Sequence, residues 1–139
     1  MRRYQNSLTY RFELRTMQDS AAKSILVVDD EEIIREFLLE VLGEDYQVST
    51  ACDGDEAIEK IKSTKYDLII TDLKMPRVSG EEVVKFAREQ DPNYQVVVIS
   101  GYSTLFSVSD SAKGGACAFL SKPFSISDLM NTVAECIAQ

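Results

Sequence analysis

Residues 25–32 read Ile25-Leu-Val-Val-Asp-Asp-Glu-Glu32, an apolar run that stops at adjacent acids. Later apolar runs stop in the same way at Asp72, at Ser100 and at Lys122. Short apolar runs bounded by polar residues are typical of strands buried in a parallel sheet. Because the carboxyl ends of parallel strands share one edge of the sheet, we expect these polar side chains to meet in one pocket.

Amphipathic stretches separate the apolar runs, so the chain from residue 24 alternates strand-like and helix-like segments. Five β-α units in succession predict an α/β fold, with one parallel sheet covered by helices on both faces and right-handed crossovers. The expected strands are 25–28, 46–50, 68–71, 96–99 and 117–121, and the expected helices are 31–42, 54–62, 81–90, 104–113 and 127–138. The first helix is expected to present one apolar face made of Ile33, Ile34, Phe37, Leu38, Val41 and Leu42. The Ser-rich fourth helix, 104–113, is expected to be the least stable.

Residues 1–23 do not follow this alternation. Leu8, Tyr10, Phe12 and Leu14 alternate with polar residues, which is the period-two pattern of a half-buried strand. A partly ordered leader, a strand that pairs with a second chain and the remnant of an upstream domain all remain open. We therefore divide the chain into an N-terminal extension, 1–23, and one domain, 24–139.

Charge is distributed unevenly along the chain, whose net charge is -8 at pH 7. Residues 1–23 carry five Lys or Arg against two Asp or Glu, whereas residues 24–139 carry ten against twenty-one. Such an acidic body argues against nucleic-acid binding and favours a cation or a basic partner surface. The sequence shows neither a membrane span nor a signal peptide, so we expect a cytoplasmic protein that makes no membrane contact.

Histidine is absent from the sequence. This absence excludes Ser-His-Asp and Cys-His catalysis, His-ligated zinc and a phosphohistidine carried by this chain. Cys52, Cys117 and Cys136 are odd in number and widely spaced, with no C-x-x-C pair. They are predicted to be small buried thiols.

The side chains at the strand ends suit a divalent cation and a phosphoryl group. Asp29, Asp30 and Asp72 would supply the oxygen ligands that Mg²⁺ prefers, and a bound cation would keep Asp72 ionised for attack on phosphorus. Lys122 would offset charge on the phosphoryl oxygens, and Ser100 would donate a hydrogen bond to one of them. Each residue alone also fits a helix cap or an ordinary loop, but their joint occurrence at four strand ends favours a functional site.

The chain resembles the receiver domains of response regulators in two-component signalling, over residues 24–139. The resemblance is carried by Ile25-Leu-Val-Val-Asp-Asp-Glu-Glu32, Thr71-Asp-Leu-Lys-Met-Pro76, Ser100-Gly-Tyr102 and Phe119-Leu-Ser-Lys-Pro-Phe124. It implies a flavodoxin-like, doubly wound sheet with strand order 2-1-3-4-5. It also implies Mg²⁺ as cofactor, bound directly by Asp30, mostly through water by Asp29, and by Asp72 and the main-chain carbonyl of Lys74.

By the same resemblance, Asp72 is the phosphoacceptor, and Ser100 and Lys122 bind the phosphoryl oxygens. Ser100 and Phe119 are the expected switch residues, because the ring turns inward when the hydroxyl moves toward the phosphate. Phe119 also fits the simpler interpretation of a core aromatic. The peptide bond between Lys122 and Pro123 is expected to be cis.

The function implied by the resemblance is a phosphorylation-controlled switch, not an enzyme that acts on a separate substrate. A sensor histidine kinase, a phosphotransfer protein of a phosphorelay or a small acyl phosphate would phosphorylate Asp72. The face formed by residues 104–113 and the fifth strand would then bind a downstream protein or an effector domain outside this sequence; a homodimer remains open. Lys74 and Tyr102 match positions that tune water access, and their long side chains predict a long-lived phosphoryl group with only slow autodephosphorylation.

Two alternatives belong to other classes of protein. A magnesium-dependent phosphatase of the haloacid-dehalogenase type needs Asp-x-Asp after its first strand and a cap domain, whereas this sequence has adjacent aspartates and no room for a cap. A receiver-like docking module that is never phosphorylated is disfavoured by the intact set of acids.

Overall fold

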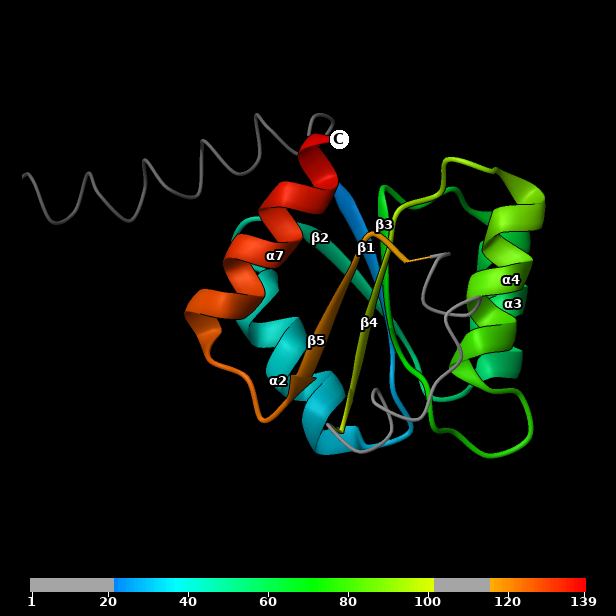
Figure 1. Cartoon of the computed structure of the whole chain (residues 1–139), viewed down its shortest axis with the longest axis horizontal. Helices are drawn as coiled ribbons and strands as arrows, with labels where there is room; N and C mark the ends of the chain where they lie inside the picture. The colour runs from blue at the N-terminus through cyan, green and yellow to red at the C-terminus, as the bar shows by residue number, and fades with distance from the viewer. Residues whose placement is uncertain (1–21, 102–115) are drawn as a thin grey trace, which may run out of the picture.

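The computed structural model describes residues 22–101 and 116–139, in which helices cover both faces of one parallel sheet (Figure 1). The strands are β1 (Ser24–Val28), β2 (Gln47–Ala51), β3 (Leu68–Asp72), β4 (Val96–Gly101) and β5 (Ala118–Lys122). The helices are α2 (Glu32–Leu42), α3 (Gly54–Ser63), α4 (Gly80–Gln90) and α7 (Ile126–Ala138). The strands pair in the order β2-β1-β3-β4-β5, all parallel, which confirms the flavodoxin-like, doubly wound order.

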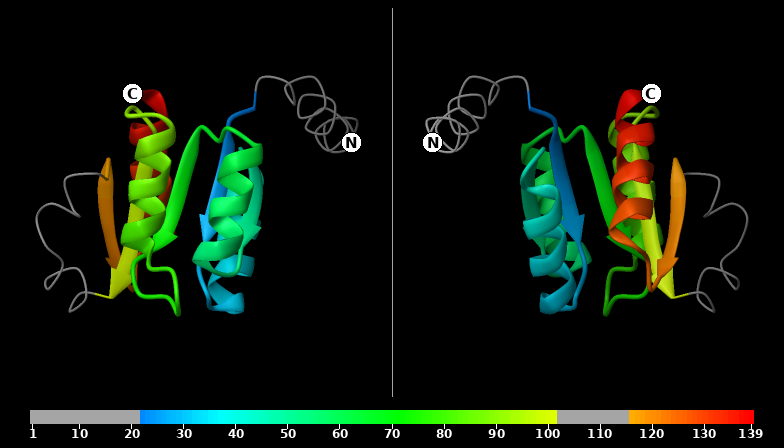
Figure 2. Two further views of the ribbon diagram at one scale, coloured as in Figure 1. Left: turned by 90° about the vertical axis from the view of Figure 1, so that its right-hand side faces the viewer. Right: turned by 90° about the vertical axis from the view of Figure 1, so that its left-hand side faces the viewer.

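Side chains that alternate along the central strands divide the core into two halves. Leu26 and Val28 of β1 pack on the side of α3 and α4, whereas Ile25 and Val27 pack on the side of α2 and α7. Figure 2 shows these two helical layers from opposite sides of the sheet. Because β1 is buried on both faces, its sequence is a continuous apolar run without the alternation of a one-sided strand.

The apolar face predicted for α2 is only partly correct. Leu38 and Leu42 are 1% and 0% exposed, but Ile33 is 72% exposed and Phe37 is 36% exposed. At about 100° per residue, Ile33 lies roughly 140° around the helix from Leu38. The sheet can cover one side of α2 only, so the predicted face was too wide.

Polar side chains cap three of the helices. The side chains of Asp53, Ser79 and Ser125 accept hydrogen bonds from backbone amides in the first turns of α3, α4 and α7. The last two helices begin one residue earlier than predicted because these serines are the N-caps. β5 likewise runs from 118 to 122, one residue later than predicted, and β2 excludes Tyr46.

The prediction of three buried thiols was wrong. Cys117 and Cys136 form a disulfide, with their Cα atoms 6.1 Å apart, and Cys52 is a free, exposed cysteine. Packing of α7 against the sheet brings together two positions that are 19 residues apart in sequence. Sequence spacing alone does not show such a contact.

Several predictions fall outside the described residues. These are the helix at 104–113, Tyr102 and nearly all of the N-terminal extension. Within residues 22–101 and 116–139, no helix has the length and apolar character needed to cross a membrane.

Candidate functional site

The side chains predicted to meet do so at the carboxyl edge of the sheet. Asp72 and Lys122 are the last residues of β3 and β5, Ser100 is the penultimate residue of β4, and Asp29 directly follows β1. The parallel ladder includes Asp72 in β3 and pairs Gly101 with Lys122. Backbone pairing therefore continues past the apolar runs, and it holds these side chains on rigid elements.

Asp72 is 7% exposed, and its carboxylate accepts more hydrogen bonds than any other of the site. One carboxylate oxygen accepts hydrogen bonds from the Ser100 hydroxyl at 3.0 Å and from the backbone amide of Lys74 at 3.1 Å. The other accepts from Lys122 Nζ at 2.9 Å. These contacts fix the orientation of the Asp72 carboxylate at the mouth of the site.

Asp29 is almost fully buried, with 2% of its surface exposed. Burial raises the pKa of its carboxyl group, against the opposing effects of a hydrogen bond from the Glu31 amide at 2.9 Å and of the Lys122 ammonium. Arg35 of α2 donates to the backbone carbonyl of Asp29 at 2.7 Å and so anchors this segment. The buried Asp29 therefore carries an electrostatic cost that a nearby cation would reduce.

Lys122 is the counter-charge among these acids. Its Nζ lies 3.0 Å from Asp29, 2.9 Å from Asp72 and 3.4 Å from Glu31. Burial disfavours the ammonium, but the hydrogen bonds to Asp72 and Asp29 and the negative charge of these two carboxylates together outweigh burial and raise the pKa of Lys122. Lys122 is therefore charged and is shared between two buried carboxylates. The peptide bond from Lys122 to Pro123 is cis, as the resemblance implied.

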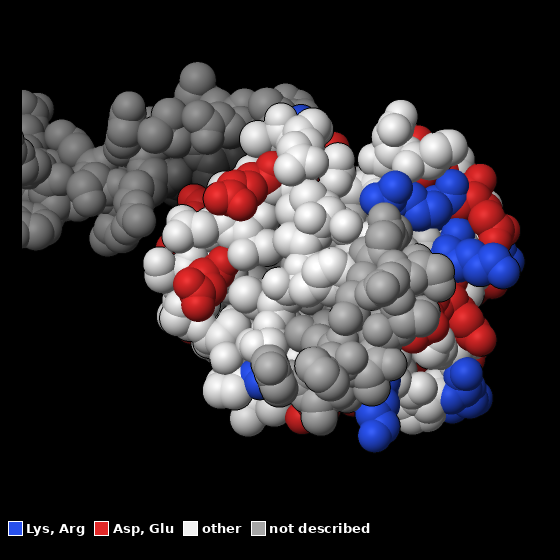
Figure 3. All heavy atoms as spheres, in the orientation of Figure 1, with Lys and Arg blue, Asp and Glu red and all other residues white. Residues whose placement is uncertain are grey.

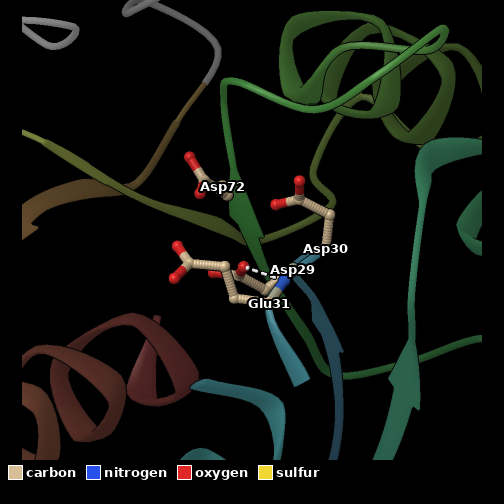
Figure 4. Close-up of side chains that lie close together, drawn as sticks. All are labelled: Asp29, Asp30, Glu31 and Asp72. Carbon is tan, nitrogen blue, oxygen red and sulfur yellow. Dashed lines mark hydrogen bonds between the residues drawn. The ribbon is translucent and has the colours of Figure 1, made fainter. Parts of the chain in front are cut away.

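Four carboxylates form a group that fits a divalent cation. Oxygen atoms of Asp29, Asp30, Glu31 and Asp72 lie within 4.8 Å of one another, and Figure 4 shows these side chains gathered at the ends of β1 and β3. An oxygen-only donor set is the kind that Mg²⁺ selects. One ammonium cannot neutralise four carboxylates, so the excess negative charge also favours a cation. The predicted metal site did not include Glu31, although Glu31 is adjacent to Asp30 in the sequence.

An open cavity of about 670 Å³ gives access to this group. Asp30, Glu31 and Asp72 line it on the acidic side, together with Ser100 and Lys122. Lys74 also lines the cavity, and the use of its main-chain carbonyl as a metal ligand stays a prediction. A small anionic group could therefore reach Asp72 from solvent.

The position of Asp72 depends on a close approach by α4. Gly80, the first residue of α4, donates its backbone N–H to the carbonyl of Leu73 at 2.9 Å. A Cβ atom at position 80 would lie 2.0 Å from the carbonyl oxygen of Asp72, so only glycine fits there. The loop between β3 and α4 is also joined to α3, because Arg77 donates to Asp53 at 2.8 Å. The predicted helix at 81–90 left Gly80 in the preceding loop, because a contact with backbone leaves no pattern in the sequence.

Phe119 does not lie in the core, because it is 39% exposed. The interpretation as a core aromatic is therefore wrong for this structure. Phe119 lies on β5, three residues before Lys122, and its role as a switch residue stays a prediction.

Residues 25–134 match the family model of the response regulator receiver domain. The chain belongs to this family. Receiver domains are regulatory switches of two-component systems rather than enzymes in the usual sense, and they bind Mg²⁺ at an acidic cluster. As a class, they interact with histidine kinases and with effector domains.

Three similar proteins match this domain over nearly their whole length. Sporulation initiation phosphotransferase F of Bacillus subtilis (strain 168) is 33% identical over 114 residues, which cover 81% of this chain and 92% of the relative. The response regulator receiver protein CpdR of Brucella abortus (strain 2308) is 32% identical over 114 residues, 81% of this chain and 95% of the relative. The solved structure of response regulator TrrA of Thermotoga maritima in complex with Mg²⁺-BeF superimposes on this chain with a TM-score of 0.75 at 38% identity. The match covers 82% of this chain and 98% of the TrrA chain. The similarity therefore spans nearly the whole of each relative.

Proposed function

We propose that this chain is a phosphorylation-activated switch in which Asp72 accepts a phosphoryl group in a Mg²⁺-dependent reaction. The observation that carries the proposal is the arrangement around Asp72: an amide, a hydroxyl and an ammonium hold its carboxylate beside three further acids. The donor would be a sensor histidine kinase or a phosphotransfer protein, and we expect the reaction to take place in the cytoplasm. The solved complex of TrrA with Mg²⁺-BeF, a relative 38% identical to this chain, supports the proposal.

The acidic residues and the Lys74 carbonyl would hold the metal ion. Asp29, Asp30, Asp72 and the Lys74 carbonyl would hold Mg²⁺, with Glu31 near enough to contribute through water. When bound, Mg²⁺ would reduce repulsion between the carboxylates and the incoming phosphoryl oxygens.

Asp72 would be the nucleophile. One of its oxygens would form a bond to phosphorus while the bond from phosphorus to the donor nitrogen breaks, leaving the imidazole of the donor and an aspartyl phosphate here. Lys122, already 2.9 Å from Asp72, would pair with a phosphoryl oxygen, and the Ser100 hydroxyl would donate to another. The side chains that hold the carboxylate before transfer would thus hold the phosphoryl group after it.

Exposed apolar side chains lie next to this site on α2. Ile33, in the first turn of α2, is 72% exposed, and Phe37, one turn further, is 36% exposed. Exposed apolar side chains beside a charged cavity are typical of protein docking surfaces. We propose that the phosphoryl donor docks on this part of α2 so that its phosphohistidine reaches Asp72.

The output would occur on a different face, which includes β5 and neighbouring α7; the stretch 104–113, predicted to be part of it, lies outside the described residues. Movement of Ser100 toward the phosphoryl group would leave space for Phe119, whose exposed ring would turn inward. α7 contains Asp128 and Glu135 but no Lys or Arg, and Figure 3 shows most of the basic side chains of this view on the side of α3 and α4. An acidic α7 favours a downstream partner with basic side chains at this face.

Incubation with acetyl phosphate and MgCl₂ tests the proposal. Intact-protein mass should rise by one phosphoryl group, and the rise should disappear with EDTA and in the Asp72→Asn variant. Asp91→Asn is the matched control, because Asp91 is a partly exposed acid that pairs with Lys65 away from the site. Phosphorylation of the Asp72→Asn variant at the native rate would contradict the proposal, and no phosphorylation of the native protein would favour a docking module.

A further inference from the structure

Cys117 and Cys136 join the start of β5 to the end of α7, and neither cysteine belongs to the site of the proposed phosphotransfer. Cys117 directly precedes β5 and donates its backbone N–H to Val96 of β4 at 2.7 Å. Cys136 lies in the last turn of α7 and is 1% exposed. Both pack against the core half under α2 and α7.

The backbone positions of this pair suit a disulfide without any movement of the fold. The Cα atoms are 6.1 Å apart, inside the usual range of roughly 4.4–6.8 Å for a disulfide. In a reducing compartment, disulfides are rare and are mostly transient or redox-sensing. We propose that Cys117 and Cys136 are a reversible redox pair, which fastens the end of α7 to the start of β5 when it is oxidised.

The oxidant would be a peroxide, and the difference in exposure sets the order of the steps. Cys117 is partly exposed and reacts first: its thiolate attacks one peroxide oxygen, the O–O bond breaks, and water leaves after proton uptake. Buried Cys136 then attacks the sulfenic sulfur of Cys117, the S–O bond breaks, and a second water leaves. Two thiols and one hydrogen peroxide give one disulfide and two waters, and a dithiol reductant reverses the change with two electrons and two protons.

The pair lies at the opposite edge of the sheet from the acidic group. Cys117 is five residues before Lys122, so about 16 Å of extended strand separates them. Oxidation should therefore leave phosphotransfer to Asp72 unchanged while limiting movement of α7 against β5. This effect on output rests on the proposed function, whereas the redox pair itself does not.

Counting free thiols tests the redox pair directly in the native chain. The full chain is reduced, desalted, treated with hydrogen peroxide, denatured and alkylated with N-ethylmaleimide before intact-mass measurement. We expect three labels on the reduced protein and one, on Cys52, after oxidation, with peptide mapping showing Cys117 joined to Cys136. Three labels after oxidation, a bond that involves Cys52, or a pair that dithiothreitol does not reduce in the folded protein would overturn the proposal.

Thermal unfolding supplies a second measurement. A bond that closes a loop of this length should raise the Tm of the oxidised protein by about 10 °C over the reduced protein. The Cys52→Ser variant should keep this difference, and Cys117→Ser should lose it. An equal Tm for both redox forms of the native chain would also overturn the proposal. Acetyl-phosphate labelling of both forms separates the two proposals, since a failure to phosphorylate either form would affect only the proposed function.

Discussion

Replacement of Lys122 by Met should lower the free energy of unfolding by about 3 kcal/mol in metal-free buffer. The Nζ atom of Lys122 lies 2.9 Å from Asp72 and 3.0 Å from Asp29, whose side chains are 8% and 3% exposed. Removal of one partner from a buried ion pair typically costs about 3–5 kcal/mol, because a buried charge is left unpaired. We expect the lower end of this range because Lys122 itself is 19% exposed and Asp29 can take up a proton.

Bound Mg²⁺ and low pH should each reduce the loss of stability in Lys122→Met. Mg²⁺ bound by the acids would replace the missing positive charge, so MgCl₂ should stabilise Lys122→Met more than the native protein. Burial raises the pKa of Asp29, so its folded form binds a proton more readily than its unfolded form. Without Lys122 this shift should be larger, and the variant should regain stability relative to the native protein as pH falls toward the folded pKa of Asp29.

Urea unfolding followed by circular dichroism, with EDTA or with MgCl₂ and at a series of pH values, measures the loss of stability and both effects. Lys62→Met is the matched control: Lys62 pairs with Glu59 at 3.3 Å, but the two side chains are 54% and 73% exposed. Such an exposed pair should contribute less than about 1 kcal/mol. The reasoning would be refuted if Lys122→Met lost no more stability than the control, or if MgCl₂ stabilised the native protein and the Lys122→Met variant equally.

Three further predictions concern the surroundings of the site. Gly80→Ala should lower the free energy of unfolding, measured with urea, by at least about 2 kcal/mol, because the new Cβ would meet backbone atoms. Gly101→Ala is the control and should cost far less, because a Cβ there has no neighbour within 4 Å. Equal losses in the two variants would count against the close approach of α4 to β3. Asp53→Ala should lose about 1 kcal/mol at neutral pH through the missing helix cap. The first-turn amide lowers the pKa of Asp53 below 3.8, so this stabilisation is present above that pH and should vanish as pH falls through the lower, folded pKa. Lys74 and Tyr102 predict a phosphoryl group that survives well beyond seconds once the donor is removed, and loss within seconds in time-resolved mass measurements would contradict this.

The strands and the site could be predicted from sequence because both depend on local patterns. A strand buried on two faces must be apolar throughout, so each run marks its strand and the polar residue that ends it marks the edge of the sheet. Asp72, Ser100 and Lys122 were placed correctly for this reason. The predicted ends of β3, β4 and β5 were one or two residues short, because backbone pairing includes the polar residues themselves, whereas the predicted end of β1 was correct.

Features that depend on contacts between distant elements could not be predicted in this way. Ile33 and Leu38 share a helical apolar pattern, but only the position of the sheet decides which of them is buried. Cys117 and Cys136 meet because α7 crosses beside β5, and Gly80 is needed because α4 starts against the end of β3. None of these contacts leaves a periodic signal in the sequence.

The ammonium contributed by Lys122 comes 93 positions after its buried partner Asp29. Since a chain leaves the ribosome from its N-terminus, the acids emerge long before the residue that balances them. A nascent chain that still lacks β5 also lacks the ammonium that pairs with Asp29 and Asp72. Folding of the acidic site can therefore be completed only after β5 has been synthesised.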